Sequence, residues 1–163
     1  MRGGPRVAEV WLADESRTAA LGRALASRLH PGDVLALEGP LGAGKTSLAR
    51  ALIHALPGPS GSETEPVPSP TFTLVQVYER AVAPVWHFDL YRIGRPEELW
   101  ELGWEEALAG GIVLIEWPQR AGTLLPGAAL VITLAAGSED GRRATLSGPP
   151  PWDRRLAGLN LDG

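Results

Sequence analysis

The segment GPLGAGKT, from Gly39 to Thr46, fits the pattern Gly-x-x-x-x-Gly-Lys-[Ser/Thr] without a mismatch. In this pattern, backbone N–H groups and the positive end of the following helix point at one spot and form a concave site for an anion. Glycines let the backbone approach phosphate oxygens closely and adopt positive φ angles. The residues expected to bind phosphate groups here are Gly39, Leu41, Gly42, Ala43, Gly44, Lys45, Thr46 and Ser47.

Lys45 is the only lysine of the chain, because the other 14 of its 15 basic residues are arginines. A compact ammonium group reaches β- and γ-phosphates as a point charge, whereas the planar guanidinium of arginine would not fit the same crowded loop. The hydroxyl of Thr46 is expected to bind Mg²⁺. The segment therefore predicts binding of a nucleoside triphosphate with magnesium.

The base of that nucleotide is constrained by residues that the chain lacks. Guanine-specific proteins usually carry Asn-Lys-x-Asp, which is impossible here because the only asparagine is Asn160 and the only lysine is Lys45. The pattern Asp-x-x-Gly does not occur either. ATP is therefore favoured over GTP as the ligand, with ADP as its product.

Two acidic residues at strand ends are candidates for the rest of a phosphoryl-transfer site, which needs a carboxylate for the metal and a group that orients the nucleophile. Glu116 follows the apolar run GIVLI and is expected at the carboxyl edge of a buried strand, where open α/β sheets bind ligands. Asp89 lies in WHFDLYR, where period-two alternation puts it on one face with His87 and Tyr91. From the pattern alone, either acid could be structural, and His87 could be a structural or a functional residue.

Two further residues near these acids allow several interpretations. Thr71 lies in SPTFT, where Pro70 forces Ser69 into an extended conformation. Thr71 could reach the metal when its loop closes, or it could belong to a plain turn into the next strand. Trp117 could stack on a base, contact a partner or pack in the core.

Strands that alternate with helices predict an α/β protein. We expect a P-loop NTPase-like, three-layer fold with a mixed, mainly parallel central sheet and a C-terminal antiparallel hairpin with an Asp140-Gly141 turn. One domain is expected over residues 1–148, and the Pro-rich tail, 149–163, is expected to be loosely attached. The expected strands are 7–12, 33–39, 73–78, 85–90, 111–117, 129–134 and 143–146, and the expected helices are 16–29, 46–56 and one that begins near 95.

The bulk composition excludes several classes of function. The net charge is −4 with no run of like charges, which argues against direct binding of DNA or RNA through a basic face. The chain has no cysteine, so thiol catalysis and cysteine metal sites are excluded. The run AALVITLAA is far shorter than the roughly 20 residues that span a bilayer. MRGGPRV lacks the apolar core of a signal peptide, and we expect a cytoplasmic protein with no membrane contact.

Five segments between Gly39 and Arg120 together resemble the TsaE (YjeE) family, the small ATPases of bacterial tRNA threonylcarbamoyladenosine synthesis. They are GPLGAGKTSLARAL, SPTFTLVQVYE, HFDLYRI, PEELWELGWEEAL and IVLIEWPQR. The resemblance implies ATP binding at the glycine-rich loop, with Thr46 and Glu116 as magnesium ligands and Asp89 as an acid needed for turnover. It also implies that Glu15 and Arg142 border the nucleotide.

The implied partners are TsaB and TsaD, the pair that modifies adenosine 37 of tRNAs reading codons that begin with A. ATP hydrolysis would reset that complex between turnovers, and tRNA would be held mainly by the complex. Two other functions remain open from the residues: a small-molecule kinase, and a non-catalytic sensor whose ATP and ADP states select partners.

Overall fold

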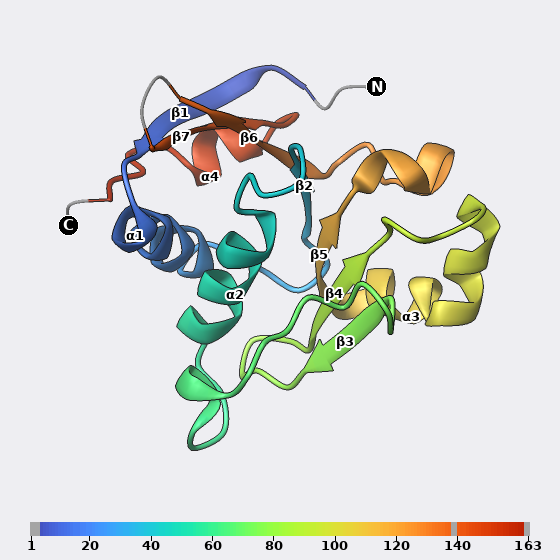
Figure 1. Cartoon of the computed structure of the whole chain (residues 1–163). Coiled ribbons are helices and arrows are strands. Elements are labelled where there is room, and N and C mark those ends of the chain that lie inside the picture. The colour runs from blue at the N-terminus through green and yellow to red at the C-terminus, as the bar shows by residue number, and fades with distance from the viewer. Residues whose placement is uncertain (1–3, 138–139, 162–163) are drawn as a thin grey trace.

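The computed structural model describes residues 4–137 and 140–161, which fold around a seven-stranded sheet (Figure 1). Its strands are β1 (Arg6–Leu12), β2 (Val34–Glu38), β3 (Val75–Tyr78), β4 (Val85–Asp89), β5 (Ile112–Glu116), β6 (Leu130–Ala136) and β7 (Arg142–Ser147). Their order across the sheet is β1-β7-β6-β2-β5-β4-β3.

The four central strands, β6, β2, β5 and β4, run parallel to one another. Antiparallel strands complete both edges: β3 pairs with β4, and β7 pairs with β6 and β1. The predicted fold class, including the C-terminal hairpin of β6 and β7, is confirmed. The predicted Asp140-Gly141 turn adjoins residues 138 and 139, which lie outside the described residues.

Helices cover both faces of this sheet. The α-helices are α1 (Glu15–Ala26), α2 (Lys45–Ala55), α3 (Trp104–Gly110) and α4 (Trp152–Arg155), and the 3-10 helices are η1 (Ser62–Thr64), η2 (Pro96–Leu102) and η3 (Pro118–Leu124). Figure 1 shows α1 and α2 side by side on one face of the sheet, with α3 on the other side. Alternate residues of β5 enter two separate hydrophobic clusters: Leu114 packs with residues of α1 and α2, and Val113 packs with Trp104 of α3. The sheet is therefore the middle of three layers.

Two segments differ from the sequence-based expectation. The single helix expected after Arg95 is divided into η2 and α3 at Gly103, because the φ of this residue is 88° and lies outside the helical range. A side chain at this position would lie 2.8 Å from the Trp86 ring. The tail was expected to be loosely attached, but its described part, residues 149–161, packs on the domain. Trp152 is buried there, and Arg155 pairs with Asp33.

The parallel strands bring the candidate site residues to one edge of the sheet. β2 leads into the glycine-rich loop before α2, and the carboxyl ends of β4 and β5 lie beside it at Asp89 and Glu116. Among residues 4–137 and 140–161, no helix is long and apolar enough to cross a membrane.

Candidate active site

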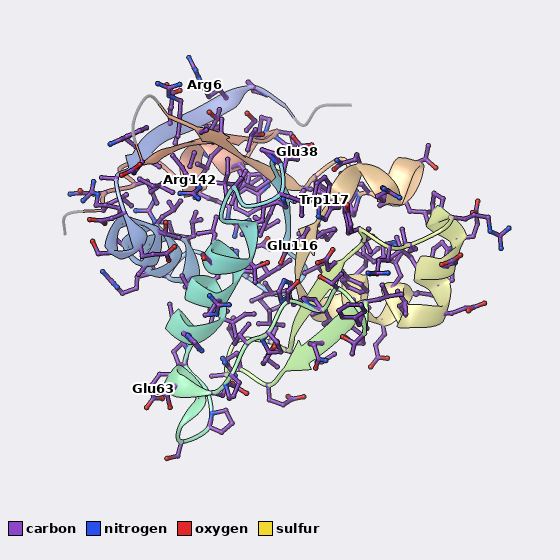
Figure 2. All side chains as sticks on the ribbon, in the orientation of Figure 1. Arg6, Glu38, Glu63, Glu116, Trp117 and Arg142 are labelled. Atoms are coloured by element: carbon purple, nitrogen blue, oxygen red, sulfur yellow. The ribbon has the colours of Figure 1, made fainter. Side chains whose placement is uncertain are left out.

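A cleft of about 370 Å³ opens at the carboxyl edge of the parallel strands. Twelve of the fourteen predicted site residues line it: Glu15, Leu41, Gly42, Gly44, Lys45, Thr46, Ser47, Thr71, Asp89, Glu116, Trp117 and Arg142. Figure 2 shows Glu116, Trp117 and Arg142 near the middle of the molecule, although Arg142 belongs to β7 and the other two lie at the end of β5 and directly after it. Gly39 and Ala43 do not line the cleft: Ala43 is buried in the core, and the carbonyl of Gly39 accepts a hydrogen bond from Lys45.

The backbone of the glycine-rich loop needs glycine at two positions in particular. Gly44 precedes α2 with a φ of 103°, in the left-handed region, and α2 begins at the next residue. Gly39 has a φ of 151°, and a side chain there would come within 2.7 Å of the Leu134 carbonyl oxygen. The loop therefore packs against β6 and presents the N-terminus of α2, an anion-binding feature, to the cleft.

Lys45 is buried, and its ammonium group donates hydrogen bonds to the carbonyl oxygens of Gly39 (2.6 Å) and Pro40 (3.0 Å). Its Nζ atom also lies 4.2 Å from the centre of the Trp117 ring, within the range of a cation–π interaction. Desolvation lowers the pKa of Lys45, and the negative charges of Glu116 and Asp89 partly oppose that shift. A cation that is removed from bulk water interacts more strongly with a nearby negative charge, such as that of a phosphate group.

Glu116 at the end of β5 is buried, with 3% of its surface exposed. The Thr46 hydroxyl donates to both of its carboxylate oxygens, at 2.9 Å to Oε1 and 3.0 Å to Oε2. Nε2 of His87 lies 2.8 Å from Oε2. The first turn of α2 and the neighbouring strand β4 therefore both bind this carboxylate.

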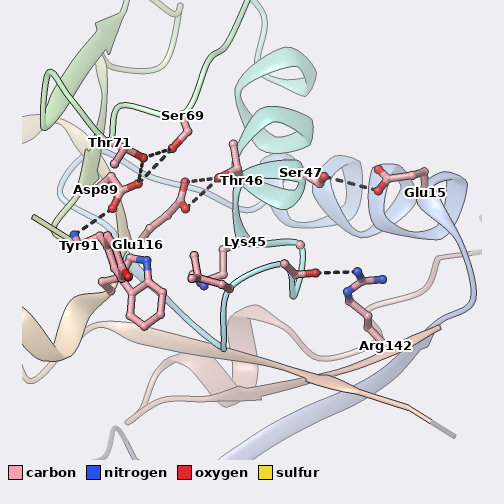
Figure 3. A pocket seen from close by; sticks show the side chains of 14 residues that line it. Glu15, Lys45, Thr46, Ser47, Ser69, Thr71, Asp89, Tyr91, Glu116 and Arg142 are labelled. Carbon is pink, nitrogen blue, oxygen red and sulfur yellow. Dashed lines mark hydrogen bonds between the residues drawn. The ribbon is translucent and has the colours of Figure 1, made fainter. Parts of the chain in front are cut away.

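Asp89 at the end of β4 is equally buried and binds a different set of donors (Figure 3). Its Oδ2 accepts hydrogen bonds from the hydroxyls of Ser69 (3.0 Å) and Thr71 (2.9 Å), and its Oδ1 accepts one from the Tyr91 N–H (3.0 Å). Asp89 and Glu116 are directly paired in the parallel register of β4 and β5. The sheet therefore holds two carboxylates side by side, next to the single lysine.

Trp117 follows Glu116 directly and adopts a left-handed conformation, with φ 59° and ψ 52°. This conformation is rare for a bulky residue and often marks a functional site. The ring of Trp117 lies 5.0 Å from that of Tyr91, and it covers the ammonium group of Lys45. Of the interpretations left open by the sequence, packing in the core holds in part: Trp117 packs against one of the two core clusters and also lines the cleft.

Glu15 and Arg142 lie at the other end of the cleft from Asp89 (Figure 3). Oε2 of Glu15 lies 3.5 Å from the Ser47 hydroxyl, and Arg142 donates a 2.7 Å hydrogen bond to the Gly42 carbonyl. Both residues come from elements distant in sequence from the glycine-rich loop. They give this end of the cleft one acidic and one basic group.

Ser69 and Tyr91 line the cleft but were not among the predicted site residues. A signal for Tyr91 was present, since strand alternation puts it on the face of Asp89. For Ser69, the only signal in the sequence was its position two residues before Thr71. Its contact with Asp89 depends on the path of the loop, and no local pattern encodes that path.

The oxygen ligands that the cleft offers fit Mg²⁺, which also takes ligands from water and substrate, better than a metal ion that is bound by protein side chains alone. Among the residues that the structure describes, no group of three or more His, Cys, Asp or Glu side chains could hold a metal ion. Mg²⁺ usually keeps several waters and takes one or two oxygen ligands from the protein together with substrate phosphates. The Thr46 hydroxyl and the Glu116 carboxylate, which are in hydrogen-bond contact, are ligands of this kind.

The family model for the threonylcarbamoyl adenosine biosynthesis protein TsaE matches residues 12–144, which include the whole cleft. The chain belongs to the TsaE family. Curated TsaE proteins resemble it over most of their length: that of Rickettsia felis is 39% identical over 83% of this chain and 77% of its own. That of Nostoc is 39% identical over 87% and 86%, and that of Bacillus subtilis is 37% identical over 80% and 78%.

A solved structure gives the same result for the fold. The crystal structure of YdiB from Bacillus subtilis superposes on this TsaE family member with a TM-score of 0.77. The match covers 93% of each chain at 28% sequence identity. The arrangement of strands and helices around the cleft is therefore that of a known protein fold.

Proposed function

We propose that this chain is a Mg²⁺-dependent ATPase, slow on its own, that serves the formation of threonylcarbamoyl adenosine on tRNA. One observation carries the proposal: Lys45, the Thr46–Glu116 pair and Asp89 meet in one cleft at the N-terminus of α2. Membership of the TsaE family supports the biological context. The contacts of the individual residues support the roles proposed for them.

The phosphate end of the cleft would bind the charged part of ATP. Lys45 and the N-terminus of α2 supply positive charge for the β- and γ-phosphates. Thr46 and Glu116 would hold Mg²⁺, which when bound neutralises charge on the phosphates. Trp117 lies over Lys45 and restricts the access of water to its ammonium group.

Asp89 would act on the attacking water molecule. The hydroxyls of Ser69 and Thr71 and the N–H of Tyr91 donate hydrogen bonds to the carboxylate and hold it in place. A charged carboxylate beside the γ-phosphate can accept a hydrogen bond from water and orient it for in-line attack. Asp89 is therefore proposed to determine turnover, whereas Glu116 and Lys45 also determine binding.

The opposite end of the cleft would bind the nucleoside. Ser47, Glu15 and Arg142 lie there, next to the start of α2. ATP is the proposed nucleotide, because the guanine-specific pattern Asn-Lys-x-Asp is absent from the sequence.

The proposed partners are TsaB and TsaD. ATP hydrolysis would act on their complex and allow repeated rounds of modification of adenosine 37 in tRNAs that read ANN codons. A net charge of −4 agrees with action on a protein complex that itself holds the tRNA. The proposed location is the cytoplasm.

The test is phosphate release from Mg-ATP by this chain alone and with purified TsaB and TsaD. A large increase with the partners would support a partner-stimulated ATPase. Negligible release in both cases, with ATP still bound, would favour a nucleotide sensor. Transfer of phosphate to a metabolite in place of free phosphate would favour a small-molecule kinase.

A further inference from the structure

We propose that His87 is a positioning residue that holds the Glu116 carboxylate for magnesium binding. This inference rests on the proposed function, in which Glu116 binds Mg²⁺. It concerns a side chain whose role the sequence left open between structure and function. It follows from the contacts of His87, from its complete burial and from the hydrogen-bond capacity of Glu116.

The side chain of His87 lies in the interior of the sheet. It is 0% exposed and belongs to β4, with β3 on one side and β5 on the other. It projects to the same face as Asp89, two residues later on the same strand. Its Nε2 lies 2.8 Å from Oε2 of Glu116, whereas its Nδ1 is buried with no hydrogen-bond partner among the residues described.

These contacts identify which ring nitrogen carries the proton. A ring with a proton on Nδ1 would bury an N–H group with no acceptor, which is costly in a protein interior. A ring with its proton on Nε2 donates it to the Glu116 carboxylate and leaves only an unused acceptor at Nδ1. We therefore assign the Nε2–H tautomer, with His87 as donor and Glu116 as acceptor.

The donors divide unequally between the two oxygens of Glu116. Oε2 receives His87 and one contact from Thr46, whereas Oε1 receives Thr46 alone. Oε1 therefore has more free lone-pair capacity and is the oxygen assigned to a cation. If the Thr46 oxygen also binds the ion, its hydroxyl must reorient, and His87 is then the contact that keeps the carboxylate in place.

A donor behind a ligating carboxylate affects metal binding in a way that a packing residue does not. Removing such outer contacts commonly weakens metal affinity or activity by about 10- to 100-fold. A histidine that only fills space in the sheet would change stability and leave the effect of magnesium on nucleotide binding unaltered. The two roles are thus separable by measurement.

The experiment compares His87→Gln with His87→Met in the full chain. The glutamine side chain can place an amide N–H near the position of Nε2, and methionine has a similar length without a donor. His54→Met is the control, since His54 is a part-buried histidine whose Nε2 contacts the Glu65 carbonyl, outside the cleft. The readout is the dissociation constant of a fluorescent ATP analogue with saturating Mg²⁺ and with EDTA.

The dissociation constant in EDTA divided by the dissociation constant with Mg²⁺ measures how much magnesium strengthens nucleotide binding. His87→Met is expected to lower this ratio about tenfold, with little change in EDTA, while His87→Gln and His54→Met keep it near wild type. An unchanged ratio in a folded His87→Met protein would overturn the proposal. A wild-type ratio of one would overturn it too but leave nucleotide binding intact, whereas wild-type protein that binds no nucleotide would overturn the proposed function itself.

If His87→Met does not fold, the wild-type protein still decides. Long-range ¹⁵N–¹H spectra distinguish the two imidazole tautomers. An Nε2–H signal for His87 that persists with Mg²⁺ and the nucleotide analogue supports the proposal, and an Nδ1–H tautomer refutes it.

Discussion

Replacement of Lys45 tests the charge and the shape of the phosphate site together. Its ammonium group has three N–H donors, and two of them bind the carbonyl oxygens of Gly39 and Pro40. At least one donor therefore remains for a phosphate oxygen. A hydrogen bond to a charged group contributes about 1.5–3 kcal/mol, so Lys45→Met is expected to weaken ATP binding by at least about 10- to 100-fold.

Lys45→Arg separates charge from shape. The ammonium group lies between two carbonyl oxygens and the Trp117 ring, 4.2 Å away, and a planar guanidinium does not fit this space without displacing the ring. We therefore expect Lys45→Arg to weaken binding by at least tenfold as well, although it keeps the positive charge.

Isothermal titration of ATP with Mg²⁺ at fixed ionic strength would measure both effects. Arg23→Met is the control, because Arg23 is an exposed residue of α1 and its replacement removes the same unit of charge from the surface. Binding by Lys45→Arg within twofold of wild type would refute the geometric argument. The single lysine would then be exchangeable with the arginine that the chain uses elsewhere.

Three further predictions follow from other parts of the structure. Asp89→Asn should bind Mg-ATP like wild type but release phosphate about 10²- to 10⁴-fold more slowly, as measured by single-turnover kinetics; equal loss of binding would contradict the separate roles of the two acids. Gly22→Ala should destabilise the protein by about 1–3 kcal/mol, because the new Cβ would lie 2.5 Å from the Cβ of Ala51. Gly110→Ala is the matched control, since a Cβ there meets open space, and it should stabilise the protein by about 0.5–1 kcal/mol. Thermal unfolding of the two variants would measure both changes. Trp152→Ala should cost about 3–5 kcal/mol in urea unfolding, since the indole is buried and donates to the Ala128 carbonyl; a loss below 1 kcal/mol would mean that the tail is loosely attached in solution.

The parts of the site that local patterns encode were predictable from the sequence. The glycine-rich loop is a contiguous motif, and the strand before it and the helix after it were expected within a few residues of β2 and α2. Asp89 and Glu116 were expected at strand ends, because apolar runs indicate buried strands and period-two alternation indicates which side chains share one face of a strand. Their direct pairing also requires β4 and β5 to be neighbours, which is a property of the whole sheet.

Contacts between distant segments were not predictable in this way. The tail packs on the domain partly through the pairing of Arg155 with Asp33, 122 residues earlier. No periodicity in the sequence predicts such a contact. The left-handed conformation of Trp117 places its ring over Lys45, yet a strand followed by Trp-Pro predicts no such turn. Ser69 reaches Asp89 only because its loop returns to the end of β4.

The two acids differ in what holds them, and this difference bears on how binding and turnover are related. Glu116 is bound by Thr46 of α2 and His87 of β4, both in regular elements. Asp89 shares its Oδ2 with two hydroxyls of the 69–73 loop, where the neighbouring Phe72 is 81% exposed. A change in that loop would alter the hydrogen bonds of Asp89 and leave those of Glu116 intact. Under the proposed function, nucleotide binding therefore depends on the framework of the sheet and α2, and turnover depends in addition on a loop that is accessible from outside the cleft.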